Sequence, residues 1–547
     1  MTRALAFLAL AGLVACGDRG ATAGGGTIIL GAAADADALL PGIVRSVQGR
    51  IGSELLFDRI AEMGPSLETA GDRAFEPMLA RSWDWSADSL TLTLHFDPAA
   101  RWHDGRPVRS SDYSFALRVV REPNLASSIA ADVAGIDSIT TPDSVTAVVH
   151  YATRDAEQFY AASLLVPIPE HIYGSVALAD LRTSPEARAP VGNGRFRFVA
   201  WEPDVRIELR AVEDHYRGRA KPDRIILAKS ADPASGLARV WAEETDVWDP
   251  LLADVLPEAA RYPHVRVYSG PGFDYGFAAF NFRANGNVSR PHPLLADARM
   301  RRALSLGTDR AALVRTVFDS TASVLLGPFL RAQATADTTL RQIPHDRAAA
   351  QALLDSLGWL PSPDGIRRRN GVPLRVSLLV PTSSAPRNRA AAVLQQQWKE
   401  IGVDAQIESL EFQTFLDRMA AGRFDIALQS FRSTPSPRGI RSVWGSPAIA
   451  GPSRQNAGRY ASPAFDEAVM DGLGALDPAA RRAAFRRAYQ QAIDDAAAIW
   501  LFESRSNVAV HRRFTPPLWR SDAWWLTLSE WTLDPAARLP RDAAPSP

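Results

Sequence analysis

A run of alternating strand and helix patterns in the C-terminal half most restricts how this chain can fold. The run comprises strand segments at 374–380, 404–410 and 425–431, separated by helical segments at 390–401 and 412–422. Consecutive strands joined by helical crossovers lie side by side in one sheet, with the helices packed over its face. This part of the chain is therefore predicted to form a parallel sheet covered by helices.

Other segments predict a mixed α/β chain with more than one domain. The 547 residues suggest roughly three or four domains. Residues 89–96 alternate strictly, with Leu90, Leu92, Leu94 and Phe96 on one face, which predicts a strand. Further segments are a strand at 205–212, a helix capped by Ser111-Asp112 and running to Val120, a helix at 479–498 and a strand at 500–510.

The N-terminus has the pattern of an export signal that ends at the only cysteine. A basic start at 1–3 precedes an uncharged apolar run at 4–15, and Cys16 follows directly. A thiol just beyond a cleavable apolar segment can be alkylated by a lipid, and the arrangement resembles the bacterial lipobox. We expect a signal peptide at 1–15, a lipidated Cys16 and a Gly-rich tether at 16–26, and hence an exported protein. The alternative is a plain secretory signal with an incidental cysteine.

Charge and hydropathy exclude two classes of partner. The 61 Lys and Arg residues balance 61 Asp and Glu residues, so the net charge is zero. A nucleic-acid binder needs clustered excess positive charge, and we expect no such partner. Apolar runs are also shorter than the roughly 18–20 residues of a membrane-spanning helix. We expect a monomer attached to a membrane through its lipid.

No motif for catalysis or for a tightly bound cofactor stands out. The nine histidines include no pair four residues apart, and one cysteine cannot build a thiolate metal cluster. The sequence lacks a G-x-S-x-G elbow, a P-loop and an S-x-x-K motif. Carboxylates are abundant, so a glycosidase-like acid pair stays open. We expect no cofactor, no metal site and no enzyme activity.

Several short motifs follow one another along the chain. The most distinctive is RWHDGRPV at 101–108. Others are PMLARSWDWS at 77–86, PVGNG at 190–194, RMRRALS at 299–305, LGW at 357–359 and IGV at 401–403. In the same order they resemble motifs of family 5 extracellular solute-binding proteins, the dipeptide, oligopeptide and nickel receptors of bacterial ABC importers. The first is the most specific, because it is similar to the family's K-W-H-D-G-x-P-V. Most of these residues also fit structural roles: Trp102-His103-Asp104-Gly105 as a turn, Asp112 as a helix cap, and Gly192 and Gly194 as turn glycines.

The resemblance implies an α/β fold of two lobes, the periplasmic-binding-protein type II fold, with an extra α+β domain inserted in the first lobe. It implies lobe I at 27–60, 190–270 and 504–533, the inserted domain at 61–189 and lobe II at 271–503. Crossovers near 268–273 and 502–505 would join the lobes, and the ligand would close the cleft by hinge motion. The Pro- and Ala-rich residues 534–547 are expected to be disordered.

The resemblance also indicates candidate ligand-binding residues. Phe412 and Phe431 stand where peptide receptors often carry Trp, and Phe115 stands where an aromatic of the inserted domain reaches the cleft. These three residues fit ordinary core packing equally well. The other expected members of the ligand-binding set are Arg432, Thr434 and Asn456.

Thr434 stands where peptide receptors typically carry the Asp that pairs with the α-ammonium of the ligand. A hydroxyl cannot neutralise a buried ammonium, and Arg432 would add a like charge. The sequence thus favours a solute with an acid or another polar group over ordinary free-amino peptides, unless Glu411 or Asp425 supplies the missing carboxylate.

Together these features predict a solute-binding lipoprotein of an ABC importer. It would capture a peptide-like or other small polar solute between its lobes and deliver it to the permease subunits. The alternatives are a secreted hydrolase, and a receptor or sensor that is not coupled to transport.

Overall fold

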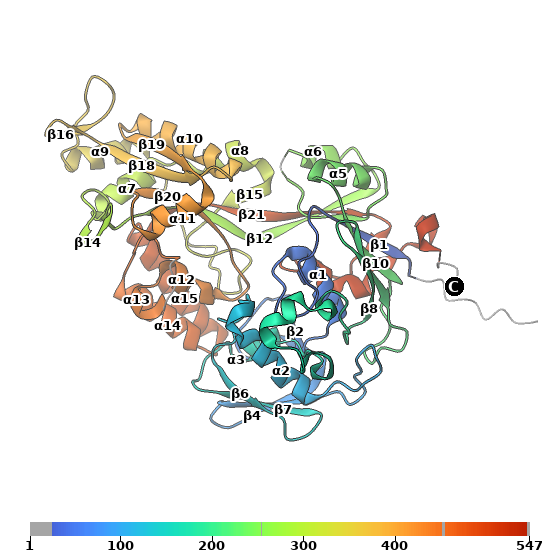
Figure 1. Cartoon of the computed structure of the whole chain (residues 1–547). Helices are drawn as coiled ribbons and strands as arrows, with labels where there is room; N and C mark the ends of the chain where they lie inside the picture. The colour runs from blue at the N-terminus through green and yellow to red at the C-terminus, as the bar shows by residue number, and fades with distance from the viewer. Residues whose placement is uncertain (1–24, 253, 451–454, 544–547) are drawn as a thin grey trace, which may run out of the picture.

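The computed structural model describes residues 25–252, 254–450 and 455–543. The predicted signal peptide and Cys16 lie outside the described residues. An eleven-stranded sheet runs through the molecule in the order β19-β18-β20-β12-β21-β11-β1-β10-β9-β8, with β15 also paired to β21 (Figure 1). Its strands are β19 (Asp404–Leu410), β18 (Arg375–Pro381), β20 (Ile426–Arg432), β12 (Val265–Phe280), β21 (Ala498–His511), β11 (Val247–Trp248), β1 (Thr27–Ala32), β10 (Arg224–Lys229), β9 (Arg206–Ala211), β8 (Phe196–Glu202) and β15 (Ala322–Val324).

The long strands β12 and β21 belong to both halves of the molecule (Figure 1). Up to Pro271, β12 pairs with β21 alone, and from Tyr275 onward it pairs with β21 on one side and β20 on the other. The register shifts between these two residues, beginning inside the expected crossover at 268–273. Gly276 permits the close approach, because a Cβ there would lie 2.3 Å from the Phe502 ring. The expected mixed α/β fold of two lobes is confirmed, whereas the residue boundaries of the lobes stay a prediction.

The predicted β-α-β-α-β run forms one side of the second lobe, and its parallel pairing is confirmed. β18 pairs in parallel with both β19 and β20. Leu378 of β18 packs in one core with Leu394 and Trp398, which are fully buried. The helices of this lobe are α7 (Ala298–Leu306), α8 (Arg310–Phe318), α9 (Arg347–Ser356), α10 (Ala385–Glu400), α11 (Phe412–Ala420), α12 (Ile440–Trp444), α13 (Pro447–Ala450), α14 (Pro463–Gly474) and α15 (Pro478–Asp494).

The segment 61–189 holds a separate four-stranded antiparallel sheet in the order β4-β5-β7-β6. Its elements are β4 (Ala80–Trp85), β5 (Thr91–Phe96), β6 (Ile136–Thr140), β7 (Thr146–Tyr151), α2 (Ser110–Arg121), α3 (Gln158–Leu164) and α4 (Glu170–Tyr173). The predicted alternation is confirmed in β5, where Leu92, Leu94 and Phe96 are buried. The first lobe adds α1 (Val47–Leu56), α5 (Pro233–Trp241) and α6 (Leu256–Ala259).

The motif at 102–105 forms the predicted turn. Gly105 has φ of +88° and donates its N–H to the Trp102 carbonyl at 2.8 Å. The Asp112 carboxylate accepts from the Trp102 indole at 3.0 Å and from the Arg109 N–H at 2.8 Å. Asp112 is therefore not the N-cap that we expected: α2 begins at Ser110, and Asp112 lies in its first turn. From that position the carboxylate reaches back to the N–H that precedes the helix.

The expected disorder after Leu533 is wrong for residues 534–543. Asp542 is buried and accepts from Arg513 Nη1 at 2.6 Å and from the Thr27 N–H at 2.9 Å. Arg513 also binds Asp246, at 2.7 Å, and both side chains are fully buried. The composition of this segment suggested disorder, but one carboxylate ties it to a buried arginine and to the first strand.

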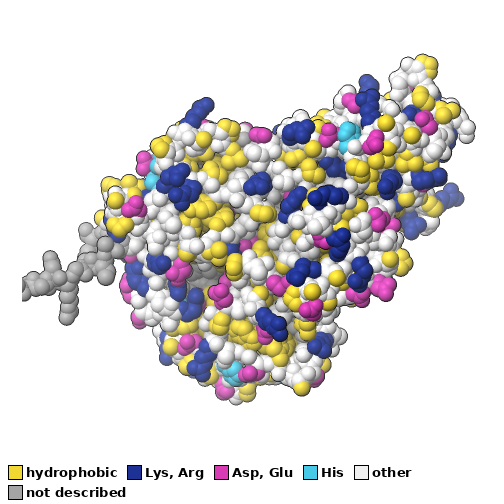
Figure 2. All heavy atoms as spheres, turned by 180° about the vertical axis from the view of Figure 1, so that it is seen from behind, with side chains coloured by type: hydrophobic (Ala, Val, Ile, Leu, Met, Phe, Trp, Pro, Cys, Tyr) yellow, Lys and Arg dark blue, Asp and Glu magenta, His cyan; other side chains and the backbone are white. Residues whose placement is uncertain are grey.

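Positive and negative side chains are mixed on the described surface (Figure 2). Figure 2 shows Lys and Arg side chains interspersed with Asp and Glu over one face of the molecule, in keeping with the zero net charge. Within the described ranges, no helix has both the length and the apolar character that crossing a bilayer requires.

Candidate functional site

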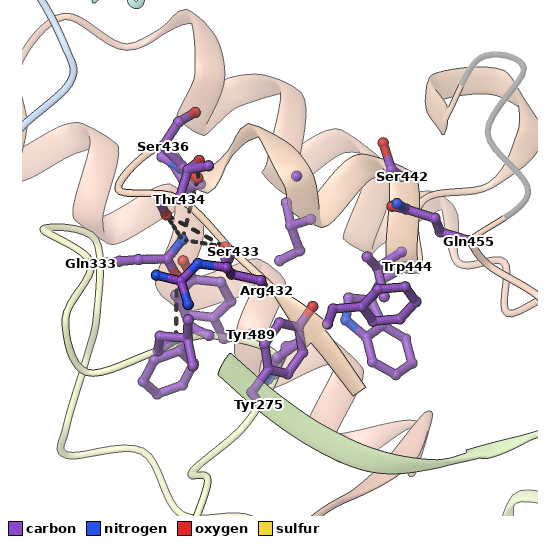
Figure 3. A pocket seen from close by; sticks show the side chains of 18 of the residues that line it. Tyr275, Gln333, Arg432, Ser433, Thr434, Ser436, Ser442, Trp444, Gln455 and Tyr489 are labelled. Atoms are coloured by element: carbon purple, nitrogen blue, oxygen red, sulfur yellow. Dashed lines mark hydrogen bonds between the residues drawn. The ribbon is translucent and has the colours of Figure 1, made fainter. Parts of the chain in front are cut away.

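A cavity of about 240 Å³ lies at the end of β20 (Figure 3). Most of its lining belongs to the second lobe and comes from β12, the loop 328–333, residues 431–444 and α15. Asp132 is the lining residue that comes from the inserted segment. The cavity therefore lies where the two parts of the molecule meet.

Gln333 fixes the loop that follows β20 (Figure 3). Its side-chain amide donates to the carbonyl of Thr434 at 3.1 Å and to that of Ser436 at 3.3 Å. The Gln333 side chain is buried, so water does not compete strongly for these bonds. Among the described residues, the Thr434 hydroxyl has one hydrogen-bond partner, the Ser436 carbonyl, at 3.5 Å, which is the limit of hydrogen-bond distance. That hydroxyl can therefore bind a ligand.

Aromatic rings line the cavity away from this polar loop (Figure 3). Tyr275 and Phe431 lie on paired strands, with ring centroids 6.2 Å apart. Both rings neighbour Phe277, which packs on Trp444 at 4.7 Å. The Tyr275 hydroxyl points into the cavity. Flat apolar faces beside a fixed row of polar groups suit a small ligand with both apolar and hydrogen-bonding parts.

The charged groups at the cavity are unevenly paired. Arg432 binds Asp274 on the neighbouring strand at 2.9 Å. Burial raises the pKa of Asp274, and the Arg432 guanidinium opposes that rise. Burial also raises the pKa of Asp132. In the part of the chain that the structure describes, no hydrogen bond or ion pair holds the Asp132 carboxylate.

A cluster of buried charges joins the inserted segment to the second lobe beside the cavity. Glu157, which is 1% exposed, accepts from Arg481 at 2.7 Å, from Ser436 Oγ at 2.7 Å and from Arg438 Nε at 3.1 Å. The Ala156 N–H, on the same segment, donates to a backbone carbonyl of α14 at 3.2 Å. We call Glu157, Arg438 and Arg481 the Glu157 cluster. Its bonds hold the two parts against each other.

The structure brings together three of the six residues in the expected ligand-binding set. Phe431, Arg432 and Thr434 all line the cavity. Sequence reasoning missed Asp132, Gln333 and Trp444. No local pattern marks Asp132 or Gln333, because each reaches the cavity from a distant loop. Trp444 could have been suspected only as one of 14 tryptophans in the chain.

The other three expected residues lie away from the cavity. Phe115 is 1% exposed and packs in the core under Arg118, so it does not reach the ligand space as we expected. Phe412 is 44% exposed at the start of α11. The side-chain amide of Asn456 holds the local backbone, because it donates to the Gly445 and Tyr460 carbonyls at 2.9 and 2.8 Å.

The two acids considered as substitutes at position 434 have structural partners instead. Glu411 caps α11 and accepts from two backbone N–H groups at 2.8 and 3.1 Å. Asp425 contacts His292 at 3.1 Å and accepts from the Ser377 N–H at 2.7 Å. Neither residue lines the cavity. The described ranges also contain no group of three or more His, Cys, Asp or Glu side chains that could hold a metal ion.

Comparison with known proteins places the chain in a family. The profile described as "Bacterial extracellular solute-binding proteins, family 5 Middle" matches residues 74–450. Protein XP55 of Streptomyces lividans is 25% identical over 481 residues, covering 87% of this chain and 83% of that protein. Di/tripeptide-binding protein 2 of Pseudomonas aeruginosa is 23% identical over 462 residues, covering 79% of this chain and 81% of that protein.

Solved structures show the same fold. The ABC transporter substrate-binding protein CtaP of Listeria monocytogenes matches with a TM-score of 0.79 at 19% identity, covering 93% of this chain and 99% of that one. NikZ of Campylobacter jejuni, in complex with Ni(L-His), matches with a TM-score of 0.73 at 20% identity, covering 92% and 99%. The fold, the order of the motifs and the profile match agree, and the chain belongs to the family 5 bacterial extracellular solute-binding proteins.

Proposed function

We propose that this protein is the receptor of an ABC importer and captures a small peptide-like solute in the cavity at the end of β20. The observation that carries the proposal is the cavity itself, where aromatic rings face a fixed polar loop at the junction of the two lobes. Relatives named as a di/tripeptide-binding protein and as an ABC transporter substrate-binding protein support it. Lobe closure would bury the solute and present a closed surface to the permease.

The size of the cavity favours a small solute. A volume of about 240 Å³ lies below the roughly 300–1,000 Å³ of typical small-molecule pockets. An amino acid or a dipeptide would fill such a space, whereas a long peptide would need the cavity to open. We therefore propose a solute between the size of an amino acid and that of a dipeptide.

Native mass spectrometry of the purified protein tests this function by identifying a co-purifying solute. A thermal-shift screen should include small peptides, N-blocked peptides, sugars and metal chelates. A true ligand at 100 times its Kd should stabilise the fold by about 2.7 kcal/mol. Phe431→Ala should reduce the shift because the ring lines the cavity, whereas Phe412→Ala, a matched control outside it, should not. Turnover of a peptide or ester by the pure protein would contradict a receptor.

We also propose that a lipid on Cys16 attaches the protein to a membrane. The support is the sequence pattern, a basic start and an apolar run that ends at this single cysteine. Cys16→Ser should move the protein into the soluble fraction and abolish labelling by a fatty-acid probe. A variant that stays in the membrane fraction would contradict the anchor.

A further inference from the structure

Asp132 is an acidic residue of the cavity lining that has no bound counter-charge. It lies among the residues around the cavity, and among the described residues nothing binds its carboxylate through a hydrogen bond or an ion pair. Burial raises the pKa of Asp132, as expected for a carboxylate that loses water and gains no partner. An unpaired carboxylate in such a place is costly unless something binds it.

The two charged groups whose fields act on Asp132, and the basic residue of the cavity lining, are already paired. Arg438 and Glu157 are the charged groups whose fields act on Asp132, and they do so with opposite signs. They bind each other at 3.1 Å. Arg432, the basic residue that lines the cavity, is paired with Asp274 at 2.9 Å. These cations each have a carboxylate, and Asp132 is left with none of them.

The polar groups that line the cavity with Asp132 suit a primary ammonium. An ammonium has three N–H donors and no acceptor. Besides the carboxylate, the cavity offers two neutral oxygens, the Tyr275 hydroxyl that points into it and the Thr434 hydroxyl at the limit of its one internal bond. A charge-assisted bond to Asp132 and weaker bonds to neutral oxygens would satisfy all three donors.

We propose that Asp132 binds the ammonium group of the solute, so that this receptor selects amine-bearing solutes of amino-acid to dipeptide size. The inference rests on the proposed function and names the solute class for the same cavity. It reverses the expectation drawn from Thr434, because the carboxylate comes from the inserted segment instead of the loop after β20. Asp132 is also the one described lining residue that precedes position 271. An ammonium bound to it would therefore link the inserted segment to the second lobe and couple charge recognition to closure.

Calorimetry with matched probes tests the proposal. The probes are L-alanine and L-alanyl-L-alanine, each with its N-acetyl counterpart, which lacks the ammonium. The wild type should bind the amine probes more tightly than the acetylated ones. Asp132→Asn should weaken the amine probes by roughly 10- to 100-fold and leave the acetylated ones within about twofold. Asp137→Asn, a matched control on the exposed edge of β6, should match the wild type.

A second readout follows closure. Small-angle scattering should show that an amine probe lowers the radius of gyration of the wild type. At the same probe concentration, the radius of gyration of Asp132→Asn should fall by less. Wild-type affinities for amine probes in Asp132→Asn would overturn the inference. A co-purifying solute without an amino group would also overturn it, yet the solute-binding function would stand. Absence of any co-purifying solute, with no binding of any probe, would overturn both.

Discussion

His103 belongs to the most specific motif of the sequence, but it is not among the residues that line the cavity. Its Nε2 lies 2.9 Å from the Gly194 carbonyl, so it ties the motif at 101–108 to the one at 190–194. Burial lowers the pKa of His103 to about 4 from the usual 6.5. The neutral ring is the form that the fold accommodates. The motif therefore marks the family by its packing, in agreement with the turn reading of the sequence.

This burial predicts how stability depends on pH. Between pH 6.5 and about 4 the unfolded state binds a proton that the folded state does not. The contribution of His103 is therefore complete above pH 6.5 and is lost as the pH falls to 4 and below, by about 3 kcal/mol in all. His103→Gln, which can still donate to Gly194, should show a shallower loss of stability over this window. Urea unfolding at pH 4.5, 5.5 and 7.5 measures the slope, and parallel curves for the two proteins would contradict the prediction.

Single residues of the site could be predicted only where a motif carries them. Phe431 and Arg432 end β20 and Thr434 follows it, so aligning that strand with the family places all three together. Phe115 was expected to reach the cleft, but α2 turns its side chain into the core. A family match alone does not show which face of a helix a residue lies on. Asp132 could not be found, because its role depends on a neighbouring lobe more than 140 residues away in sequence.

At the scale of elements, periodic patterns were reliable and composition was not. The parallel β18–β19 and β18–β20 pairing follows from alternating strand and helix patterns, which report local burial. The segment 534–543 has no such period, and its Pro and Ala content suggested disorder. Its ordered position depends on Asp542, a single charged group whose buried partner Arg513 lies in a separate motif-free stretch. Composition does not register a contact of this kind.

Asp542→Ala tests how much this docking contributes. Arg513 keeps Asp246 but loses its second carboxylate, and the Thr27 N–H loses its acceptor. Because these groups are buried, we expect the free energy of unfolding to fall by about 2–3 kcal/mol. Asp494→Asn, which changes an exposed carboxylate on α15, should cost less than about 0.5 kcal/mol. Chemical denaturation of both variants gives the comparison, and equal stabilities would show that the terminal segment only rests on the surface.

At the scale of the whole molecule, the Glu157 cluster joins the inserted segment to the second lobe. Figure 1 shows α3 of the inserted segment facing the α14 and α15 region of the second lobe. Glu157, just before α3, reaches Arg481 on α15 and Arg438 before α12. No sequence pattern predicts this contact, because it joins isolated polar residues that share no motif. Opening of the lobes would break it and return each charge to water.

Glu157→Gln should therefore favour the open molecule. In the closed arrangement Arg481, which has no exposed side-chain surface, would lose its nearer carboxylate and keep the more distant one of Glu68, at 3.8 Å. Such a loss costs about 3 kcal/mol, or roughly a 100-fold shift toward opening, because in the open form water solvates the arginine. Solute that binds the closed form would bind more weakly as the closed population falls. Scattering at one fixed concentration of an amine probe should show a larger radius of gyration for Glu157→Gln than for the wild type, and calorimetry a weaker affinity. Glu170→Gln, which breaks an exposed ion pair within the inserted segment, is the control and should change neither quantity. Equal radii and affinities for Glu157→Gln and the wild type would mean that the lobes are held together by their packing and not by this cluster.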